Sequence, residues 1–190
     1  FRALKLLYPT KVEGSSTLLL NACAPQAQHV KLTFPARENM PKVAMPEVEV
    51  HWYDGGMMPD RPEGFPQGKE LMGEGGGLCI FHGTKDTLIC GCYGVNPWLL
   101  SGRKPNVPQT LRRVKDAMKG GHEQDWIRAC KESAGSRVQT KSNFLEAGPF
   151  NEMVVMGVLA VRLQRLNKEL LWDGPNTVSY THLRAHETSQ

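Results

Sequence analysis

The sequence lacks both a long hydrophobic run and a strong excess of one charge. No apolar stretch approaches the ~20 residues that a membrane-spanning helix requires, so we expect no membrane span. Lys and Arg number 23 against 19 Asp and Glu, and the net charge of +4 is modest. The basic residues Arg112, Arg113, Lys115 and Lys119 are interrupted by apolar residues and have no interleaved aromatics. This pattern favours a solvated surface over a nucleic-acid interface.

A disulfide framework is also missing. The five cysteines are an odd number in a chain of 190 residues, which argues against paired bridges. Cys90 and Cys92 flank one glycine in a predicted strand and so face the same side, but zinc sites usually space cysteines by about two to four residues and add a second pair. We therefore expect no metal site and interpret the cysteines as buried thiols that pack as small hydrophobic groups. Free thiols slightly favour a reducing compartment, and the sequence leaves cytoplasm and periplasm both open.

Familiar catalytic patterns are absent too. Paired carboxylates, a Ser/His/Asp set and a Cys/His nucleophile pair cannot be argued from this sequence, so we assign no catalytic residue. The glycine-rich segment 73–77 superficially resembles a phosphate-binding loop. A dinucleotide fingerprint follows a strand and opens a helix, whereas here no strand precedes and a strand is predicted to follow. We interpret the segment as a flexible lead into a hairpin, without cofactor-binding residues.

Alternating apolar and polar residues predict most of the secondary structure as strands. The hairpin turn is expected at 83–85, where Gly, Thr and Lys separate two apolar runs. Strands mostly in succession, with helices grouped late, indicate an α+β fold with an open, mostly antiparallel sheet and helices packed on one face. The expected strands are 11–21, 29–34, 47–53, 77–82, 86–92 and 170–172.

Three helices are expected, at 108–118, at 122–133 and from Pro149 to about 166, because proline suits the first turn of a helix. In the second, Trp126, Ile127 and Cys130 share one side. In the third, a stripe of small and apolar residues predicts a core face rather than a cofactor site; it comprises Met153, Met156, Gly157, Ala160 and Val161. The connections 54–77 and 93–108 lack periodicity, and connections of this length are commonly functional or mobile.

The segment EVEVHWYDGG, residues 47–56, is the most informative local pattern. Val48, Val50 and Trp52 should form an apolar row on one face of a strand, with His51 and Tyr53 on the other. Asp54 and the two glycines after it then favour a turn. The pattern fits two interpretations, a solvated strand face with a turn, or a site in which His51, Tyr53 and Asp54 are delivered together to one end of the sheet.

Four further residues are candidates for a sugar-binding site, because such sites combine polar donors with aromatic faces. Asn96 and Trp98 lie in the connection after the predicted hairpin, and His122 and Trp126 lie at the start of the predicted helix at 122–133. The structural alternative for His122 is an N-cap position, with Asp125 in the first turn favoured by the helix dipole.

Five segments in order carry a resemblance to a known family. They are EVEVHWYDGGMMPDRPEG, GGGLCIFHGTKDTLICGCYGVNPWLL, GGHEQDWIRAC, SNFLEAGPFNEMVVMGVLAVRL and LLWDGPN. Together they resemble the C-terminal domain of the Gfo/Idh/MocA oxidoreductases, relatives of glucose–fructose oxidoreductase and inositol dehydrogenase, in the form common in Bacteroidetes-like bacteria. The resemblance covers residues 1–177 as one domain. It implies an α+β fold whose exposed sheet face often makes oligomer contacts.

The resemblance implies NAD(P)-dependent hydride transfer on a sugar, cyclitol or related polyol. Cofactor and catalytic groups would belong to a preceding Rossmann domain and its Glu-Lys-Pro motif, which this sequence does not contain, so we expect the chain alone to be inactive. The residues His51, Tyr53, Asp54, Asn96, Trp98, His122 and Trp126 would then belong to the substrate pocket. Two alternatives stay open, an NAD-dependent glycoside hydrolase of the same fold family and a non-catalytic sugar-binding or assembly module.

Both ends of the sequence have unusual features. The segment 1–7 begins in the middle of a helical pattern that Pro9 ends, which indicates missing upstream sequence. Residues 178–188, VSYTHLRAHET, match the translation of a transposase adapter used in sequencing libraries. We therefore expect 178–190 to be a non-native tail and exclude it from the fold. This exclusion removes His182 and His186 from any search for a site.

Overall fold

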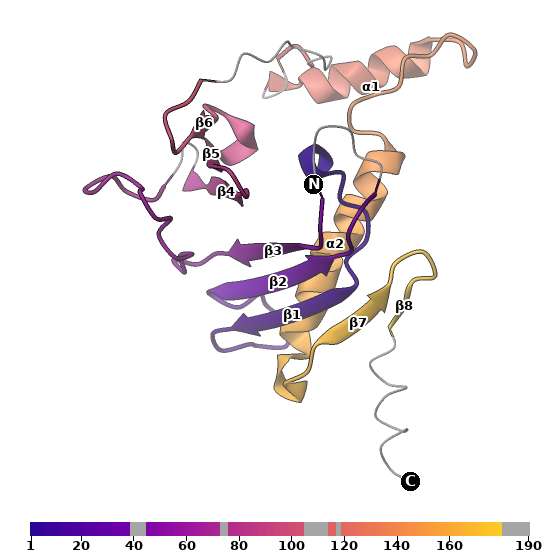
Figure 1. The fold of residues 1–190 in the computed structure, drawn as a ribbon. Coiled ribbons are helices and arrows are strands. Elements are labelled where there is room, and N and C mark those ends of the chain that lie inside the picture. The colour runs from indigo at the N-terminus through magenta and orange to yellow at the C-terminus, as the bar shows by residue number, and fades with distance from the viewer. Residues whose placement is uncertain (39–44, 73–75, 105–113, 117–118, 180–190) are drawn as a thin grey trace. The chain divides into compact units, whose positions relative to one another are not determined.

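The computed structural model of the protein describes residues 1–38, 45–72, 76–104, 114–116 and 119–179. The chain divides into two compact units, one formed by Phe1–Met58 with Arg113–Gln190 and the other by Pro59–Arg112. Their strands and helices make an α+β fold with open antiparallel sheets, as predicted (Figure 1). The predicted helix at 108–118, and Arg112 and Arg113 of the basic group, fall mainly outside the described residues.

A five-stranded antiparallel sheet forms the centre of the first unit. Its strand order is β3-β2-β1-β7-β8, and the predicted strand at 29–34 is confirmed as β2, with each residue paired to β3 in register from His29↔Tyr53 to Phe34↔Val48. The strands are β1 (Lys11–Ser16), β2 (Gln28–Phe34), β3 (Val48–Tyr53), β7 (Leu170–Asp173) and β8 (Val178–Ser179). Val178 and Ser179 belong to the expected non-native tail, and the rest of that tail, 180–190, is not described.

Strand β1 is shorter than the predicted strand at 11–21. The ladder with β2 ends at Ser16↔Gln28, and Thr17 then bonds to Ala27 through both its N–H and its hydroxyl. No strand residue of β2 remains to pair with the leucine run that follows, so Leu18 and Leu20 are exposed. The apolar run was wrongly interpreted as a continuation of the strand.

The core of the first unit lies between the sheet and helix α2 (Phe144–Arg162) (Figure 1). Val12, Leu32 and Phe34 face the helix, whose Met156 and Ala160 are buried against them. The predicted core stripe of this helix is confirmed: Met156, Gly157, Ala160 and Val161 are buried and Met153 packs at the edge of the cluster. Leu170, at the start of strand β7, is buried in the same cluster.

Helix α2 begins five residues earlier than predicted. Asn143 is its N-cap, and its side chain accepts a hydrogen bond from the Glu146 N–H at 3.3 Å. Pro149 therefore lies inside the helix rather than in its first turn. The sequence signal was the polar residue followed three positions later by glutamate, which is a capping pattern and outweighs the preference of proline for the first turn.

We expect Asn143→Ala to lower the free energy of unfolding by about 1 kcal/mol, because the helix start loses its side-chain acceptor and the Glu146 N–H keeps only the Asn143 carbonyl, 3.1 Å away. Denaturant unfolding followed by circular dichroism measures the change. Asn143→Asp keeps an acceptor oxygen and is the matched control, expected to unfold close to the wild type. A wild-type midpoint for Asn143→Ala would contradict the capping role.

The outer face of α2 is apolar and exposed. Leu145 and Val155 are more than half exposed, and Val158 is 49% exposed. By length and composition the helix could cross a membrane, with a mean hydropathy of 1.4. Its opposite face packs on the sheet, although only 22% of its apolar window is buried.

Helix α1 (Gly121–Lys131) confirms the second predicted helix but not its predicted apolar side. Trp126 is 64% exposed and Cys130 is exposed, whereas Asp125 is buried. The Asp125 carboxylate accepts hydrogen bonds from Arg128 and from the Lys141 N–H. A buried, hydrogen-bonded carboxylate therefore fixes the rotation of α1, which the apolar pattern alone did not indicate.

The second unit contains a three-stranded antiparallel sheet, β4-β5-β6. The predicted hairpin is confirmed as β4 (Leu78–His82) and β5 (Thr87–Gly91). Strand β6 (Trp98–Leu99) was missed, because two residues are too short for a periodic signal; it pairs with β5 through Ile89↔Trp98. Cys90 is the buried cysteine of the described chain, so the prediction of buried thiols is wrong for Cys23, Cys79 and Cys130, which are exposed.

Part of the long connection after β3 packs within the second unit. Phe65 is buried, and the Arg61 guanidinium donates to the carbonyls of Pro66 and Lys69 at 2.6 and 2.8 Å. The connection is therefore held in a defined conformation near Phe65 by side-chain to backbone hydrogen bonds.

Candidate functional site

The seven sequence-predicted residues fall in three places. His51, Tyr53 and Asp54 lie at the end of β3, and His122 and Trp126 lie on α1, all in the first unit. Asn96 and Trp98 lie around β6 in the second unit. Among the described contacts, neither His122 nor Trp126 bonds or stacks with the group at the end of β3.

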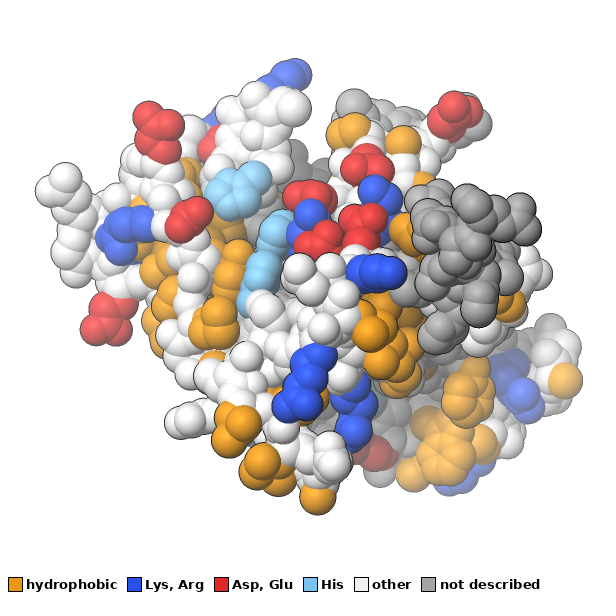
Figure 2. All heavy atoms as spheres, turned by 90° about the horizontal axis from the view of Figure 1, so that it is seen from below, with side chains coloured by type: hydrophobic (Ala, Val, Ile, Leu, Met, Phe, Trp, Pro, Cys, Tyr) orange, Lys and Arg blue, Asp and Glu red, His pale blue; other side chains and the backbone are white. Residues whose placement is uncertain are grey.

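Three aromatic side chains line up across β2 and β3 on the sheet face opposite α2. His29 stacks on Tyr53 with ring centroids 4.4 Å apart, and His29 Nε2 lies 3.0 Å from His51 Nδ1. His51 and Tyr53 thus share a face as predicted, and His29 joins them through the antiparallel register. Figure 2 shows histidine side chains beside intermixed acidic and basic side chains on one face of the molecule.

The sheet face opposite α2 also carries charged side chains of both signs in alternation. The Lys31 ammonium lies 3.2 Å from Glu49 and 3.9 Å from Glu13. The hydrogen bond with Glu49 raises the pKa of Lys31, and the same bond lowers the pKa of Glu49. Glu49 also lies 3.5 Å from His51 Nε2. The histidine pair is therefore part of a charged network on an open sheet face.

We expect acidification from about pH 7.5 to about pH 5.5 to lower the stability of the fold through His29. Burial, and then the Coulombic interaction with His51, lowers the pKa of His29 below 6.5, with Lys31 acting the same way and Glu13 opposing. The unfolded chain therefore binds a proton first, so this stabilisation is complete above pH 6.5 and is lost as the pH falls. Urea midpoints at both pH values measure it; a fall of the same size in His29→Gln would count against this assignment.

Asp54 anchors the end of the sheet. Its carboxylate accepts hydrogen bonds from the Gln28 N–H, the Gln28 side-chain amide and Trp52 Nε1, at 3.0, 2.9 and 2.9 Å. Gly55 follows at a φ of 65°, where an added Cβ would lie 2.1 Å from the Gln26 carbonyl oxygen. Because its indole bonds to Asp54, Trp52 stays 59% exposed and does not complete the predicted apolar row. These contacts support the turn interpretation for Asp54.

His122 and Trp126 lie one turn apart on an exposed face of α1. His122 Nδ1 lies 3.1 Å from the Ser142 hydroxyl. The N-cap of α1 is Gly120 rather than His122. The backbone at Gly120 has a φ of 79°, a left-handed conformation that glycine tolerates. The predicted N-cap role of His122 is therefore wrong, and its ring remains on the surface.

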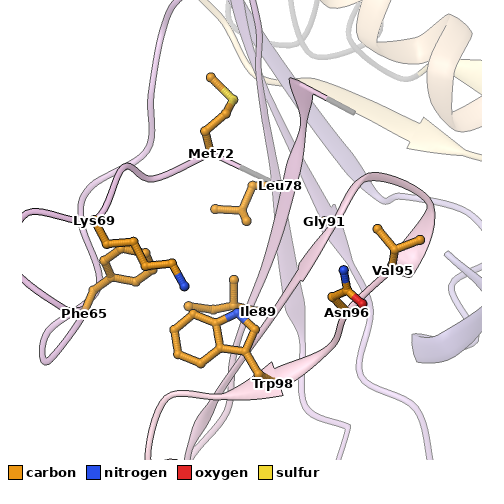
Figure 3. A pocket seen from close by; sticks show the side chains of 9 residues that line it. All are labelled: Phe65, Lys69, Met72, Leu78, Ile89, Gly91, Val95, Asn96 and Trp98. Carbon is orange, nitrogen blue, oxygen red and sulfur yellow. The ribbon is translucent and has the colours of Figure 1, made fainter. Parts of the chain in front are cut away.

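Asn96 and Trp98 line a pocket of about 280 Å³ in the second unit (Figure 3). Its walls come from β4, β5, the loop into β6 and the connection after β3. The lining residues are Phe65, Lys69, Met72, Leu78, Ile89, Gly91, Val95, Asn96 and Trp98. The volume lies just below the usual range of small-molecule sites, which suits a single ring.

Two aromatic rings, each with a cation over it, lie at this pocket, and of the two cations Lys69 belongs to its lining. The Lys69 ammonium lies 4.7 Å from the centre of the Trp98 ring, and the Arg61 guanidinium lies 4.7 Å from that of Phe65. Phe65 and Trp98 are 5.9 Å apart. Asn96 has a φ of 48°, a conformation that asparagine tolerates better than most residues. The arrangement offers an aromatic face, an amide and an ammonium to one small ligand.

The sequence analysis did not predict Phe65 and Lys69 as site residues. They lie in a connection without periodicity, so no pattern signalled that it would pack beside β6. Within the described ranges, no three or more His, Cys, Asp or Glu side chains form a group that could hold a metal ion. Gly77 leads directly into strand β4, so the described residues there do not fit a nicotinamide cofactor, whose pyrophosphate sits at a helix N-terminus.

No family of known proteins and no curated protein matches the chain.

Proposed function

We propose that residues 1–177 are the substrate-binding and oligomerisation domain of an NAD(P)-dependent oxidoreductase that acts on a sugar, cyclitol or related polyol. The observation that carries the proposal is the pocket around Trp98 and Asn96. An aromatic face can cover the C–H side of a sugar ring, while an amide satisfies both donors and acceptors among its hydroxyls. The α+β architecture agrees with the fold that the sequence resemblance implies.

In this proposal the reaction is divided between two domains. When bound to a preceding Rossmann domain, NAD or NADP supplies the hydride chemistry. The present chain contributes pocket walls that bind and orient the polyol. The chain alone should then bind polyols without oxidising them.

The exposed sheet face is the proposed surface for self-association. It carries Lys31, Glu13 and Glu49, with Lys11 and Glu169 3.6 Å apart along the sheet. Charges of both signs allow a second copy related by two-fold symmetry to place unlike charges opposite one another. Sedimentation at low and high salt tests this part of the proposal, since a monomer in both would contradict it.

Ligand-observed NMR on this chain tests polyol binding. Saturation-transfer spectra with myo-inositol and with glucose should show transfer to the ring C–H protons, which would lie against Trp98. An absence of transfer for both ligands would remove the pocket from the proposal, and oxidation of either by the isolated chain with NAD would overturn the two-domain division.

A further inference from the structure

Lys69 is the charged residue among those that line the Trp98 pocket. In Figure 3 its side chain extends over the space beside Trp98, with the ammonium toward the indole. Its backbone carbonyl accepts from Arg61, which fixes the start of the side chain. Across the described part of the chain, the ammonium has no carboxylate within ion-pair distance.

The rest of the lining is neutral and largely apolar. Met72, Leu78, Ile89 and Val95 supply aliphatic walls, and Asn96 supplies the neutral polar group. Lys69 is exposed beside these walls, and the ring of Trp98 satisfies only part of the field of its ammonium. An anionic group on the ligand would complete the pairing of Lys69.

We infer that this pocket takes an anionic monosaccharide, a uronate or an aldonate, rather than a neutral polyol. Its carboxylate pairs with the Lys69 ammonium and draws it away from the Trp98 ring over which it lies. The C–H face of the sugar then covers this ring, and a hydroxyl bonds to the Asn96 amide. The inference rests on the proposed function and narrows its substrate class. The pocket of about 280 Å³ is open to solvent and has room for one sugar ring.

Titration calorimetry of the whole chain with glucuronate, glucose and glucose 6-phosphate tests the inference. The wild type should bind glucuronate about fivefold more tightly than glucose, as expected for one exposed ion pair worth up to about 1 kcal/mol. Lys69→Met keeps the aliphatic stem and should reduce this preference to within about twofold, whereas Lys69→Arg should retain it. Lys85→Met, in the exposed hairpin turn, removes a charge outside the pocket and should behave as wild type.

The outcomes separate the two claims. Equal affinities for glucuronate and glucose, or a preference that survives in Lys69→Met, would overturn the anionic ligand and leave the proposed function in place. Tighter binding of glucose 6-phosphate than of glucuronate would overturn the carboxylate assignment in favour of a phosphate. Failure of all three to bind would overturn both the inference and the pocket's part in the proposed function.

Discussion

Gly14→Val is expected to disrupt the first unit, lowering the free energy of unfolding by at least about 3 kcal/mol. Gly14 lies in β1 where α2 crosses it, and an added Cβ would lie 2.6 Å from the Val161 nitrogen and 2.8 Å from the Ala160 carbonyl carbon. Both are backbone atoms, so no side chain can rotate away. The helix must then separate from the sheet over the buried cluster, and total stabilities of domains are only about 5–15 kcal/mol.

Denaturant unfolding of Gly14→Val and of Gly148→Ala forms the matched test. Gly148 lies in α2, and apart from its chain neighbours and the helix's own backbone no atom lies within 4 Å of an added Cβ. Alanine there should change stability by less than about 1 kcal/mol, because its better helix propensity is offset by contact of the new Cβ with the ring of Pro149, the next residue. If the Gly14 variant unfolded at the wild-type midpoint, the close approach of α2 to β1 would be wrong.

Trp98→Ala is expected to weaken sugar binding at least about 30-fold, corresponding to about 2 kcal/mol for the loss of a central aromatic contact. The indole forms one side of the pocket and holds both Phe65 and Lys69 beside it. Truncation removes the flat surface and releases the ammonium. Calorimetric titration of each variant with the tightest-binding sugar measures the change.

Two other tryptophans provide controls. Trp126 is exposed on α1 and Trp52 bonds to Asp54 at the end of β3. We expect the sugar affinity of Trp126→Ala and of Trp52→Ala to stay within about twofold of wild type. Neither residue lines the pocket, and substitutions distant from a site change its energetics by only about 0.3–0.5 kcal/mol. Loss of binding in Trp126→Ala but not in Trp98→Ala would place the site on α1 instead.

The strands were largely predictable because alternation reports burial directly. Residues 29–34 alternate in sequence, and Val30, Leu32 and Phe34 face the core while His29 and Lys31 do not. Boundaries were predicted less well where tertiary contacts decide them. β1 ends where Thr17 turns back onto Ala27, and α2 starts at a capping asparagine rather than at its proline.

The pocket was only half predictable for a related reason. Asn96 and Trp98 stood out by residue type, but Lys69 and Phe65 reach the same place through a connection without periodicity. Likewise, Trp126 was predicted on the apolar side of an amphipathic helix, whereas the buried carboxylate of Asp125 leaves it exposed. Local patterns report which side of an element is apolar, and contacts between distant segments decide the rest.

The most direct test of the central claim is to sequence the gene across both ends of this reading frame. The proposal predicts an upstream strand, glycine-rich turn and helix followed by a Glu-Lys-Pro motif, and a native C-terminus in place of residues 178–190. The complete protein should then reduce NAD or NADP in the presence of a polyol. A reading frame that opens immediately before Phe1 would contradict the oxidoreductase account and leave a binding or assembly role.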